Sequence, residues 1–171
     1  MKRVLYTILV ATILFLPKDV FAQEEWIKEN EETYYIVDGE KVTGFNTIDE
    51  VLYFFNTEGV LQTGWQETTE GKWYQREDGS VVIGRETIDG KIYYFGTNGY
   101  MQKGFIEEDE KLYFYSQANG ALKTGWQETT EGKWYQREDG SVVIGRETID
   151  GKTYYFGTNG YMQKGFIEED E

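Results

Sequence analysis

The residues that could do chemistry in this sequence are carboxylates and aromatic rings, because the 171 residues include no His and no Cys. Without these two residue types, the chain has no Ser-His-Asp or Cys-His nucleophile and no imidazole or thiolate ligand for a metal ion. It also has no side chain whose ordinary pKa lies near neutrality. We therefore expect a protein with no enzymatic activity, no catalytic residue, no cofactor and no metal site.

Acidic residues do not form a convincing catalytic or calcium-binding site, although runs such as Glu107-Glu108-Asp109-Glu110 occur. A glycosidase needs two carboxyl groups at a fixed separation across a cleft, and an EF-hand calcium loop needs Asp-x-Asp-x-Asp-Gly spacing. We interpret the acidic runs as solvated loops. The formal net charge of −14 opposes binding to nucleic-acid phosphates, which requires Lys and Arg, so we expect no nucleic-acid partner.

Aromatic rings remain, and they make up 17% of the sequence. Each ring buries more area than an aliphatic side chain, ~150 to 250 Å². Small secreted domains often depend on disulfides because their cores are thin, and this chain has no Cys to form them. We therefore expect a core of stacked rings.

Glycines divide the sequence into repeats of 20 or 21 residues. One series consists of Gly44, Gly64, Gly84, Gly104, Gly125, Gly145 and Gly165. A second series precedes it by five residues, and each member follows Asp, Glu or Asn: Gly39, Gly59, Gly79, Gly99, Gly120, Gly140 and Gly160. A longer period lies above both, since 63–110 recurs as 124–171 with Ile92 replaced by Thr153, an offset of 61 residues.

This spacing predicts an all-β chain of hairpins, because Asp-Gly and Asn-Gly between apolar runs are strong hairpin signals of the type I′ turn. Each unit is interpreted as an aromatic strand, a tight turn and a second strand, as in Tyr93-Tyr94-Phe95, Asn98-Gly99 and 100–102. A lone hairpin is marginal in water, so units this short must stack. We expect a solenoid of two-stranded β-hairpins with about 20 residues per unit and three units per super-repeat, which would place Trp65 and Trp126 on the same face.

The first 22 residues are typical of a secretory signal peptide. A basic pair, Lys2-Arg3, precedes an apolar run over 4–16 and a cleavage motif ending at Ala22. A transmembrane span needs about 20 apolar residues, so we expect cleavage, a secreted or cell-surface location and no membrane attachment afterwards. The expected divisions are 1–22 signal peptide, 23–44 N-terminal segment and imperfect first repeat, 45–165 solenoid of six hairpin units, and 166–171 start of an incomplete unit.

The ends of the solenoid each leave alternatives open. The segment 23–32 is either a loose entry or an imperfect first cap. At the other end, the chain stops before the strand that follows the same sequence in the first copy, Leu112-Tyr113-Phe114-Tyr115. Either the sequence is a fragment, or its apolar end is covered by self-association with another chain.

Several motifs together resemble the cell-wall-binding repeat superfamily. They are Thr-Gly-Trp65, Gly-Lys-Trp73-Tyr74, Asp78-Gly79, 91–95 and Asn98-Gly-Tyr-Met101. This superfamily includes choline-binding repeats of Gram-positive surface proteins, glucan-binding repeats of streptococcal glucosyltransferases and repetitive segments of clostridial toxins. The choline-binding branch implies a left-handed solenoid with ligand sites between units, in which two rings come from one unit and one from the next.

Matched position by position, the resemblance implies aromatic cages for a ligand. Their candidate residues are Trp65, Trp73, Tyr93 and Tyr94 in the first copy and Trp126, Trp134, Tyr154 and Tyr155 in the second. Other units depart from the pattern, since the Gly-Trp position holds Phe or Arg, and Arg85 and Arg146 would repel a cation. At most one good site per 61-residue turn is therefore expected.

The resulting hypothesis is a secreted binding module that attaches to choline-bearing teichoic acid of a bacterial cell wall. A quaternary ammonium has no N–H to satisfy and can face several rings. A glucan or host glycan is the alternative ligand, because the same rings can lie beneath sugar C–H faces. A structural spacer whose rings are all core is the alternative of another class.

Overall fold

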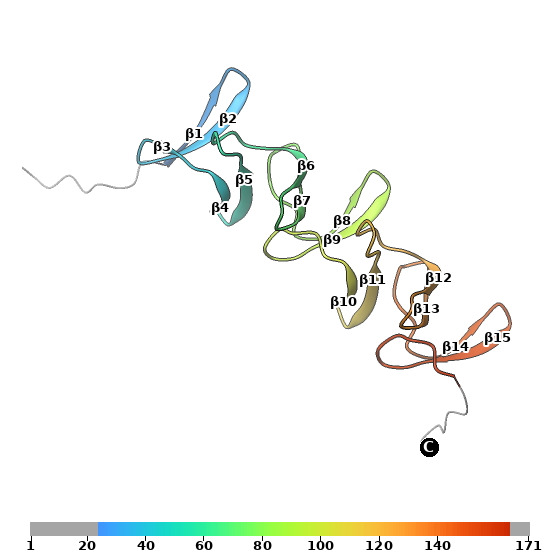
Figure 1. Cartoon of the computed structure of the whole chain (residues 1–171). Helices are drawn as coiled ribbons and strands as arrows, with labels where there is room; N and C mark the ends of the chain where they lie inside the picture. Colours follow the sequence, from blue (N-terminus) through green and yellow to red (C-terminus); the bar gives the residue numbers. More distant parts are fainter. Residues whose placement is uncertain (1–23, 165–171) are drawn as a thin grey trace, which may run out of the picture.

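The computed structural model describes residues 24–164, which form only strands, turns and loops (Figure 1). The first sheet has three strands, β1 (Glu24–Glu29), β2 (Glu32–Val37) and β3 (Glu40–Lys41). Six antiparallel hairpins follow: β4 (Gly44–Ile48) with β5 (Val51–Phe55), β6 (Gly64–Glu67) with β7 (Lys72–Gln75), β8 (Gly84–Ile88) with β9 (Lys91–Phe95), β10 (Gly104–Glu108) with β11 (Lys111–Tyr115), β12 (Gly125–Glu128) with β13 (Lys133–Gln136), and β14 (Gly145–Ile149) with β15 (Lys152–Phe156).

The predicted all-β solenoid of hairpins is confirmed. In Figure 1 the hairpins succeed one another along an elongated molecule, and those three apart project alike: β1–β2, β8–β9 and β14–β15 on one side, β4–β5 and β10–β11 on the other. The hairpins that carry Trp65 and Trp126, β6–β7 and β12–β13, also occupy equivalent places. Three hairpins therefore make one turn of the solenoid, which gives the 61-residue sequence period its structural meaning.

The position of the main turn differs from the prediction. Strand β9 makes its long pairing with the preceding strand, β8, through Asp89-Gly90. Both residues have positive φ, 49° and 71°, as a type I′ turn requires. At Asn98-Gly99 only the glycine has positive φ, and the chain beyond it returns to β9 by a single bridge, Phe95 to Met101. The Asn-Gly turn thus forms a short third segment of each unit instead of its hairpin.

These third segments join consecutive units through the backbone. In each junction of the described chain, the amide of a third-segment residue donates to a carbonyl in the second strand of the preceding hairpin, as in Val81 N to Leu52 O at 2.7 Å and Met101 N to Lys72 O at 2.7 Å. The same contact recurs one turn after the first, from Val142 N to Leu112 O, also at 2.7 Å. Because each such bond joins one particular pair of residues, the backbone fixes the register in which the hairpins stack.

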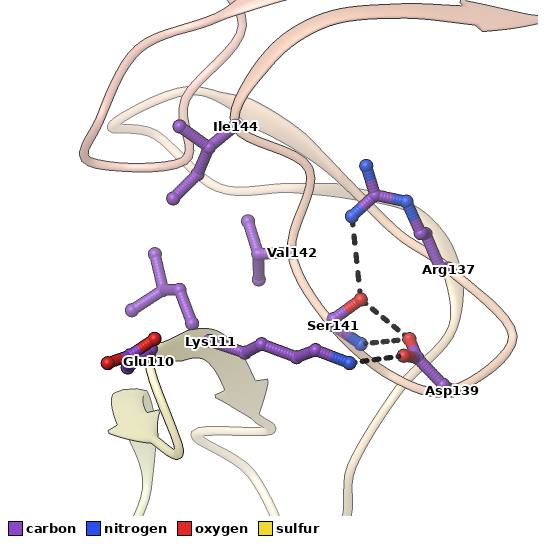
Figure 2. Close-up of a pocket in the computed structure, with 8 residues that line it drawn as sticks. Glu110, Lys111, Arg137, Asp139, Ser141, Val142 and Ile144 are labelled. Atoms are coloured by element: carbon purple, nitrogen blue, oxygen red, sulfur yellow. Dashed lines mark hydrogen bonds and ion pairs between the residues drawn. The ribbon is translucent and has the colours of Figure 1, made fainter.

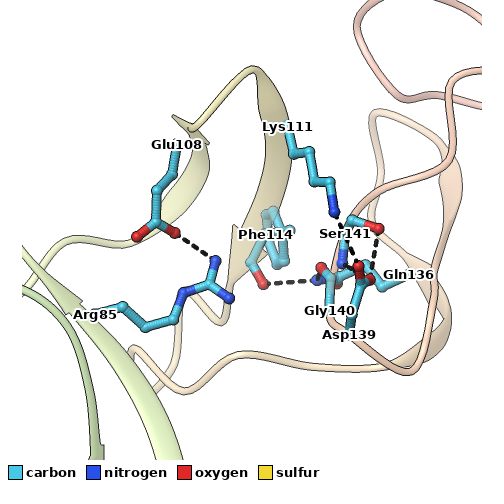
Figure 3. Close-up of polar contacts among 8 residues, drawn as sticks. All are labelled: Arg85, Glu108, Lys111, Phe114, Gln136, Asp139, Gly140 and Ser141. Carbon is cyan, nitrogen blue, oxygen red and sulfur yellow. Dashed lines mark hydrogen bonds and ion pairs between the residues drawn. The ribbon is translucent and has the colours of Figure 1, made fainter.

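A buried glutamine reinforces every third junction. Gln136 is fully buried, and its amide donates to Phe114 O of the preceding hairpin at 3.1 Å and to Gly140 O at 3.0 Å (Figure 3). Its carbonyl oxygen accepts the indole N–H of Trp134 at 3.2 Å. Gln75 makes the equivalent three contacts one turn earlier. Since buried polar groups need partners, the glutamines fix how one hairpin docks on the next.

The segment before the first predicted repeat forms a cap. Strand β1 pairs over its whole length with β2, from Glu24 opposite Val37 to Glu29 opposite Glu32. Of the two alternatives for 23–32, the described part is therefore a first hairpin and not a loose entry. The predicted signal peptide at 1–22 and incomplete unit at 166–171 lie outside the described residues.

Candidate functional site

Trp65 marks a cluster of rings that spans two hairpins. It lies on β6 directly opposite Tyr74 of β7, with ring centroids 5.3 Å apart. The next hairpin adds Tyr93 and Phe95 from β9, at 5.0 Å and 5.9 Å from the Trp65 ring. Phe95 is fully buried and forms the floor, whereas Trp65, Tyr74 and Tyr93 stay partly exposed. Two partly exposed rings of one unit and one of the next thus pack together above a buried ring.

The same arrangement occurs three times in the described chain. We call these clusters the Trp26 site, the Trp65 site and the Trp126 site. Centroid distances from the tryptophan to its three neighbours are 4.9, 5.1 and 5.9 Å in the Trp26 site and 5.3, 4.9 and 6.0 Å in the Trp126 site. Their members are Trp26, Tyr35, Tyr53 and Phe55, and Trp126, Tyr135, Tyr154 and Phe156. Trp26 is 42% exposed and Trp126 is 39% exposed, so both rings are accessible to solvent.

Trp73 and Trp134, two of the predicted cage residues, lie elsewhere. Trp73 is 1% exposed and packs on Phe45 and Phe54 of the preceding hairpin, with centroids 5.0 and 4.5 Å away. Adjacent residues of a strand point to opposite faces, so Tyr74 and not Trp73 faces Trp65. Trp134 occupies the equivalent buried position, also at 1% exposure. These two rings are core, as the spacer hypothesis expected of all of them.

The predicted Tyr-Tyr pairs are likewise divided between two faces. Tyr93 and Tyr154 belong to the Trp65 and Trp126 sites. Tyr94 lies opposite Arg85 across the β8–β9 hairpin, and its ring is 5.9 Å from that of Tyr115. Tyr155 lies opposite Arg146 in the last hairpin. The structure therefore brings together four of the eight predicted residues, in two pairs.

Sequence reasoning missed the whole Trp26 site and, at each of the other two sites, one tyrosine and the buried phenylalanine. A nine-residue spacing from each tryptophan to the tyrosine across its hairpin was the available signal: Trp26 to Tyr35, Trp65 to Tyr74 and Trp126 to Tyr135. This spacing was hard to recognise at Trp26 because no glycine precedes it, unlike the other two tryptophans. Trp26, the single ring of a charged segment, is thus the first of three equivalent tryptophans.

One ring cluster already holds a cation of the protein itself. Arg85 stands on β8 where β6 has Trp65, and its guanidinium carbon lies 3.9 Å from the centroid of the Tyr113 ring. The same guanidinium forms an ion pair with Glu108 (Figure 3). Nearby, burial raises the pKa of Tyr115 to about 12. Arg85 therefore fills this junction and leaves no open cage there.

The charges around the open sites differ. Beside Trp65 and Tyr93 lies a hollow of about 290 Å³ whose charged lining residues are Glu67, Lys72, Lys91 and Lys103. At the Trp26 site, the Tyr35 hydroxyl donates to Glu24 at 2.8 Å. Burial raises the pKa of Tyr53 there, and the negative charges of Asp78 and Asp49 add to the shift. The same rings therefore sit in a basic surrounding at one site and an acidic surrounding at another.

A second hollow, of about 360 Å³, lies between β11 and the turn after β13 (Figure 2). Asp139 accepts hydrogen bonds from Ser141 N at 2.9 Å and Ser141 Oγ at 2.6 Å, and Lys111 Nζ lies 3.4 Å away. These contacts, first those from Ser141, lower the pKa of Asp139 to about 2. Lys111 and Asp139 of this hollow are thus paired with each other, and the bonds from Ser141 to Asp139 hold the turn.

Residues 24–164 contain no helix able to cross a membrane. Within the same range, no group of three or more acidic residues is placed to hold a metal ion.

Comparisons with known proteins relate the repeats and the fold to those of other proteins. A family model of the choline-binding repeat matches 82–125 and 143–171. The fold is similar to that of choline binding protein F from Streptococcus pneumoniae, solved in the presence of a peptidoglycan analogue, with a TM-score of 0.73 and 25% identity over 82% of this chain and 52% of that chain. CbpJ from Streptococcus pneumoniae is similar as well, with a TM-score of 0.72 and 25% identity over 82% of this chain and 48% of that chain.

Curated relatives are streptococcal glucosyltransferases. The chain is 38% identical to Glucosyltransferase-S of Streptococcus downei over 139 residues, which are 80% of this chain and 7% of that protein. It is 42% identical to Glucosyltransferase-I of the same organism over 65 residues, 37% of this chain and 4% of that protein. The chain thus spans less than a tenth of the length of these relatives.

Proposed function

Because the repeats of this chain belong to the cell-wall-binding repeat superfamily, which includes the choline-binding repeat, we propose that it is an exported, non-catalytic module that attaches to a bacterial surface polymer. The attachment sites are the Trp26, Trp65 and Trp126 sites. The observation that carries this proposal is the threefold recurrence of one ring geometry, each time with the tryptophan partly exposed. Rings used only as core would be covered, as Trp73 and Trp134 are.

Choline on a cell-wall polymer is the leading ligand. At the Trp65 and Trp126 sites, a quaternary ammonium above three partly exposed rings gains ~0.5 to 2 kcal/mol from each, or ~1.5 to 6 kcal/mol in total. The Trp26 site offers two such rings, because Tyr35 is buried there. The lower and middle part of that range corresponds to millimolar binding at a single site. Several sites on one chain raise the overall affinity for a polymer by effective concentration. Three weak sites on one solenoid therefore suit a repetitive polymer better than a free small molecule.

A glucan is the second candidate, and the glucosyltransferase relatives favour it. The exposed faces of Trp26 and Trp126 could lie beneath the C–H face of a sugar, and the lysines near Trp65 could donate to its hydroxyl groups. No cation is needed for that mode of binding. Choline and glucan thus make different demands on the same three sites.

Titration calorimetry separates the candidates, because the heat of binding is measured whether or not a tryptophan remains at the site. The chain is titrated with choline chloride against matched NaCl, and with an isomalto-oligosaccharide, in the wild type and in a variant with Trp26, Trp65 and Trp126 all changed to Leu. A saturable heat with either ligand that is lost in the variant supports binding at these sites. The matched control is Trp73→Phe, which alters a buried ring and should keep the response. Absence of saturable binding with both ligands would refute the binding module and leave the structural spacer.

A further inference from the structure

We propose that the Trp65 and Trp126 sites select ligands that carry a phosphate beside the group that stacks on the rings, whereas the Trp26 site selects a cationic ligand without one. The proposal rests on the proposed function, because it names the ligand class of the same sites. It follows from the different charged residues that the structure places around nearly identical sets of rings.

Lysines surround the open position of the Trp65 site. Lys72, Lys91 and Lys103 line its hollow together with one acidic residue, Glu67. Lys72 Nζ lies 4.6 Å from the centroid of the Trp65 ring, so a free cation must compete with this ammonium for the ring. The other two lysines add like charge along the same hollow, where salt screens only partly because the Debye length is ~8 Å at physiological ionic strength. A phosphate beside the stacked group would instead pair with these lysines, which bind phosphate as point charges.

The lysines recur at the Trp126 site. The 61-residue repeat places Lys133, Lys152 and Lys164 where the Trp65 site has its three lysines. Lys133 Nζ forms an ion pair with Glu128 at 3.2 Å. Lys133 and Lys164 line one hollow together with two acidic residues, Glu128 and Glu131. Met162 lines the same hollow and packs against the core beneath Trp126. The sequence repeat therefore gives the two sites the same three lysines, with Lys133 paired to Glu128 where Lys72 lies over the Trp65 ring.

Corresponding positions of the Trp26 site lack these positive charges. Three uncharged residues replace the lysines there, namely Thr33, Val51 and Thr63. Glu24, which accepts the Tyr35 hydroxyl, stands where the Trp65 site has a threonine. Asp78, whose charge acts on Tyr53, stands where the Trp65 hollow has an asparagine.

One exchange runs against this trend at the Trp26 site. Lys28 replaces Glu67, and it is the one lysine among these matched positions. The remaining exchanges all make the Trp26 site more negative than the Trp65 site. A quaternary ammonium therefore meets fewer like charges and more carboxylates at Trp26.

The test uses the five tryptophans of the chain as separate reporters. The protein is labelled with 5-fluorotryptophan, its five ¹⁹F resonances are assigned by single Trp→Phe changes, and it is titrated at constant ionic strength. Two ligand pairs differ only by phosphate: choline with phosphocholine, and glucose with glucose 1-phosphate. Buried Trp73 and Trp134 report whether the fold is intact. Inorganic phosphate alone controls for simple anion binding.

We expect the Trp65 and Trp126 resonances to respond to the phosphorylated member of a pair at a concentration roughly three- to tenfold lower, as two or three exposed ion pairs would give. The Trp26 resonance should prefer choline to phosphocholine. In a Lys91→Gln, Lys103→Gln variant, the Trp65 resonance should lose most of its phosphate preference. Trp126 in the same molecule should keep that preference and is the internal control.

Three results would overturn the proposal. The first is equal preference at all three tryptophans, and the second is a Trp65 preference unchanged by the double lysine substitution. In both of these cases ligand still binds, so the proposed function stands. The third is no response to either pair. In that case isomalto-oligosaccharide binding decides the proposed function separately, since a response to this neutral glycan preserves the binding module without a phosphate.

Discussion

Replacing Gln136 by Leu tests whether the buried amide determines how hairpins dock. Leucine is close to glutamine in size, so the substitution removes hydrogen bonds and leaves little cavity. It deprives three groups of a partner: the Trp134 indole N–H, Phe114 O and Gly140 O. The indole nitrogen belongs to a side chain that is only 1% exposed, so water cannot easily replace the amide.

The expected loss in the free energy of unfolding is large relative to the stability of a typical domain. A buried polar group left without a partner costs about 1–3 kcal/mol, so three such groups cost roughly 3–9 kcal/mol. The apolar leucine offsets roughly 1.5–3 kcal/mol by burial. The middle of both ranges gives a net destabilisation of about 4 kcal/mol, against the 5–15 kcal/mol that is typical of whole domains. For a chain of this length, a loss of that size corresponds to a fall in Tm of about 8–16 °C.

Thermal unfolding followed by near-ultraviolet circular dichroism measures the effect, because that signal reports the packed tryptophans. The matched control is Gln127→Leu in the same hairpin, where the amide donates to Thr124 O at an exposed position. We expect the control to change Tm by less than about 2 °C, as surface substitutions do. An equal Tm for Gln136→Leu and the control would refute the claim that the buried amide stabilises the junction.

Three further predictions follow from the same structure. Trp73→Ala should cost about 3–5 kcal/mol in unfolding free energy, as for other buried tryptophans, whereas Trp126→Ala should cost less and act mainly on ligand binding; equal denaturation midpoints for both would contradict the assigned burial. Below pH 4 the Tm should fall as the pH approaches about 2. The pKa of Asp139 is lowered in the folded protein, so the stabilisation that its carboxylate provides is fully present above its ordinary pKa of 3.8 and is lost as the carboxylate is protonated. Asp139→Asn should flatten this part of the pH profile, and an unchanged profile would contradict it. Gly79→Ala should destabilise more than Gly84→Ala: both have positive φ, 82° and 79°, but only at Gly79 would the new Cβ meet a leucine, at 2.4 Å. Urea denaturation midpoints that do not differ would show that the leucine gives way.

Fold class could be predicted from sequence because the repeat constrains it so strongly. Glycines at intervals of 20 or 21 residues identify units that are too short to fold alone, and stacking is then required. The predicted location of the main turn was wrong because several loops carry Glu where a glycine is expected. Glu50 and Glu110 adopt positive φ, 67° and 62°, which is uncommon for this residue. Strand pairing on both sides of these two-residue turns imposes a backbone conformation that the local sequence does not favour.

The candidate site was predictable in part, and the reason lies in strand alternation. The resemblance placed Trp73 beside Trp65 because the two residues match the Lys-Trp and Gly-Trp positions of the family's repeat. The strand register instead places Tyr74 opposite Trp65 and turns Trp73 into the core. The resemblance could select the rings, but the face that each ring occupies depends on the position of the first turn, which the Asp-Gly and Asn-Gly signals do not locate.

The three-hairpin turn also determines how the sites can act together. The Trp65 and Trp126 sites lie on hairpins one full turn apart, which Figure 1 shows in equivalent places, whereas Trp26 lies on a hairpin of the β8–β9 and β14–β15 side. One polymer strand running along the solenoid can therefore reach both lysine-rich sites without crossing to another face. Effective concentration favours the second contact only when the geometry permits it, so under the proposed function these two sites form the bivalent pair. The Trp26 site lies on another side and carries different charges, which suits an independent contact with a second chemical group.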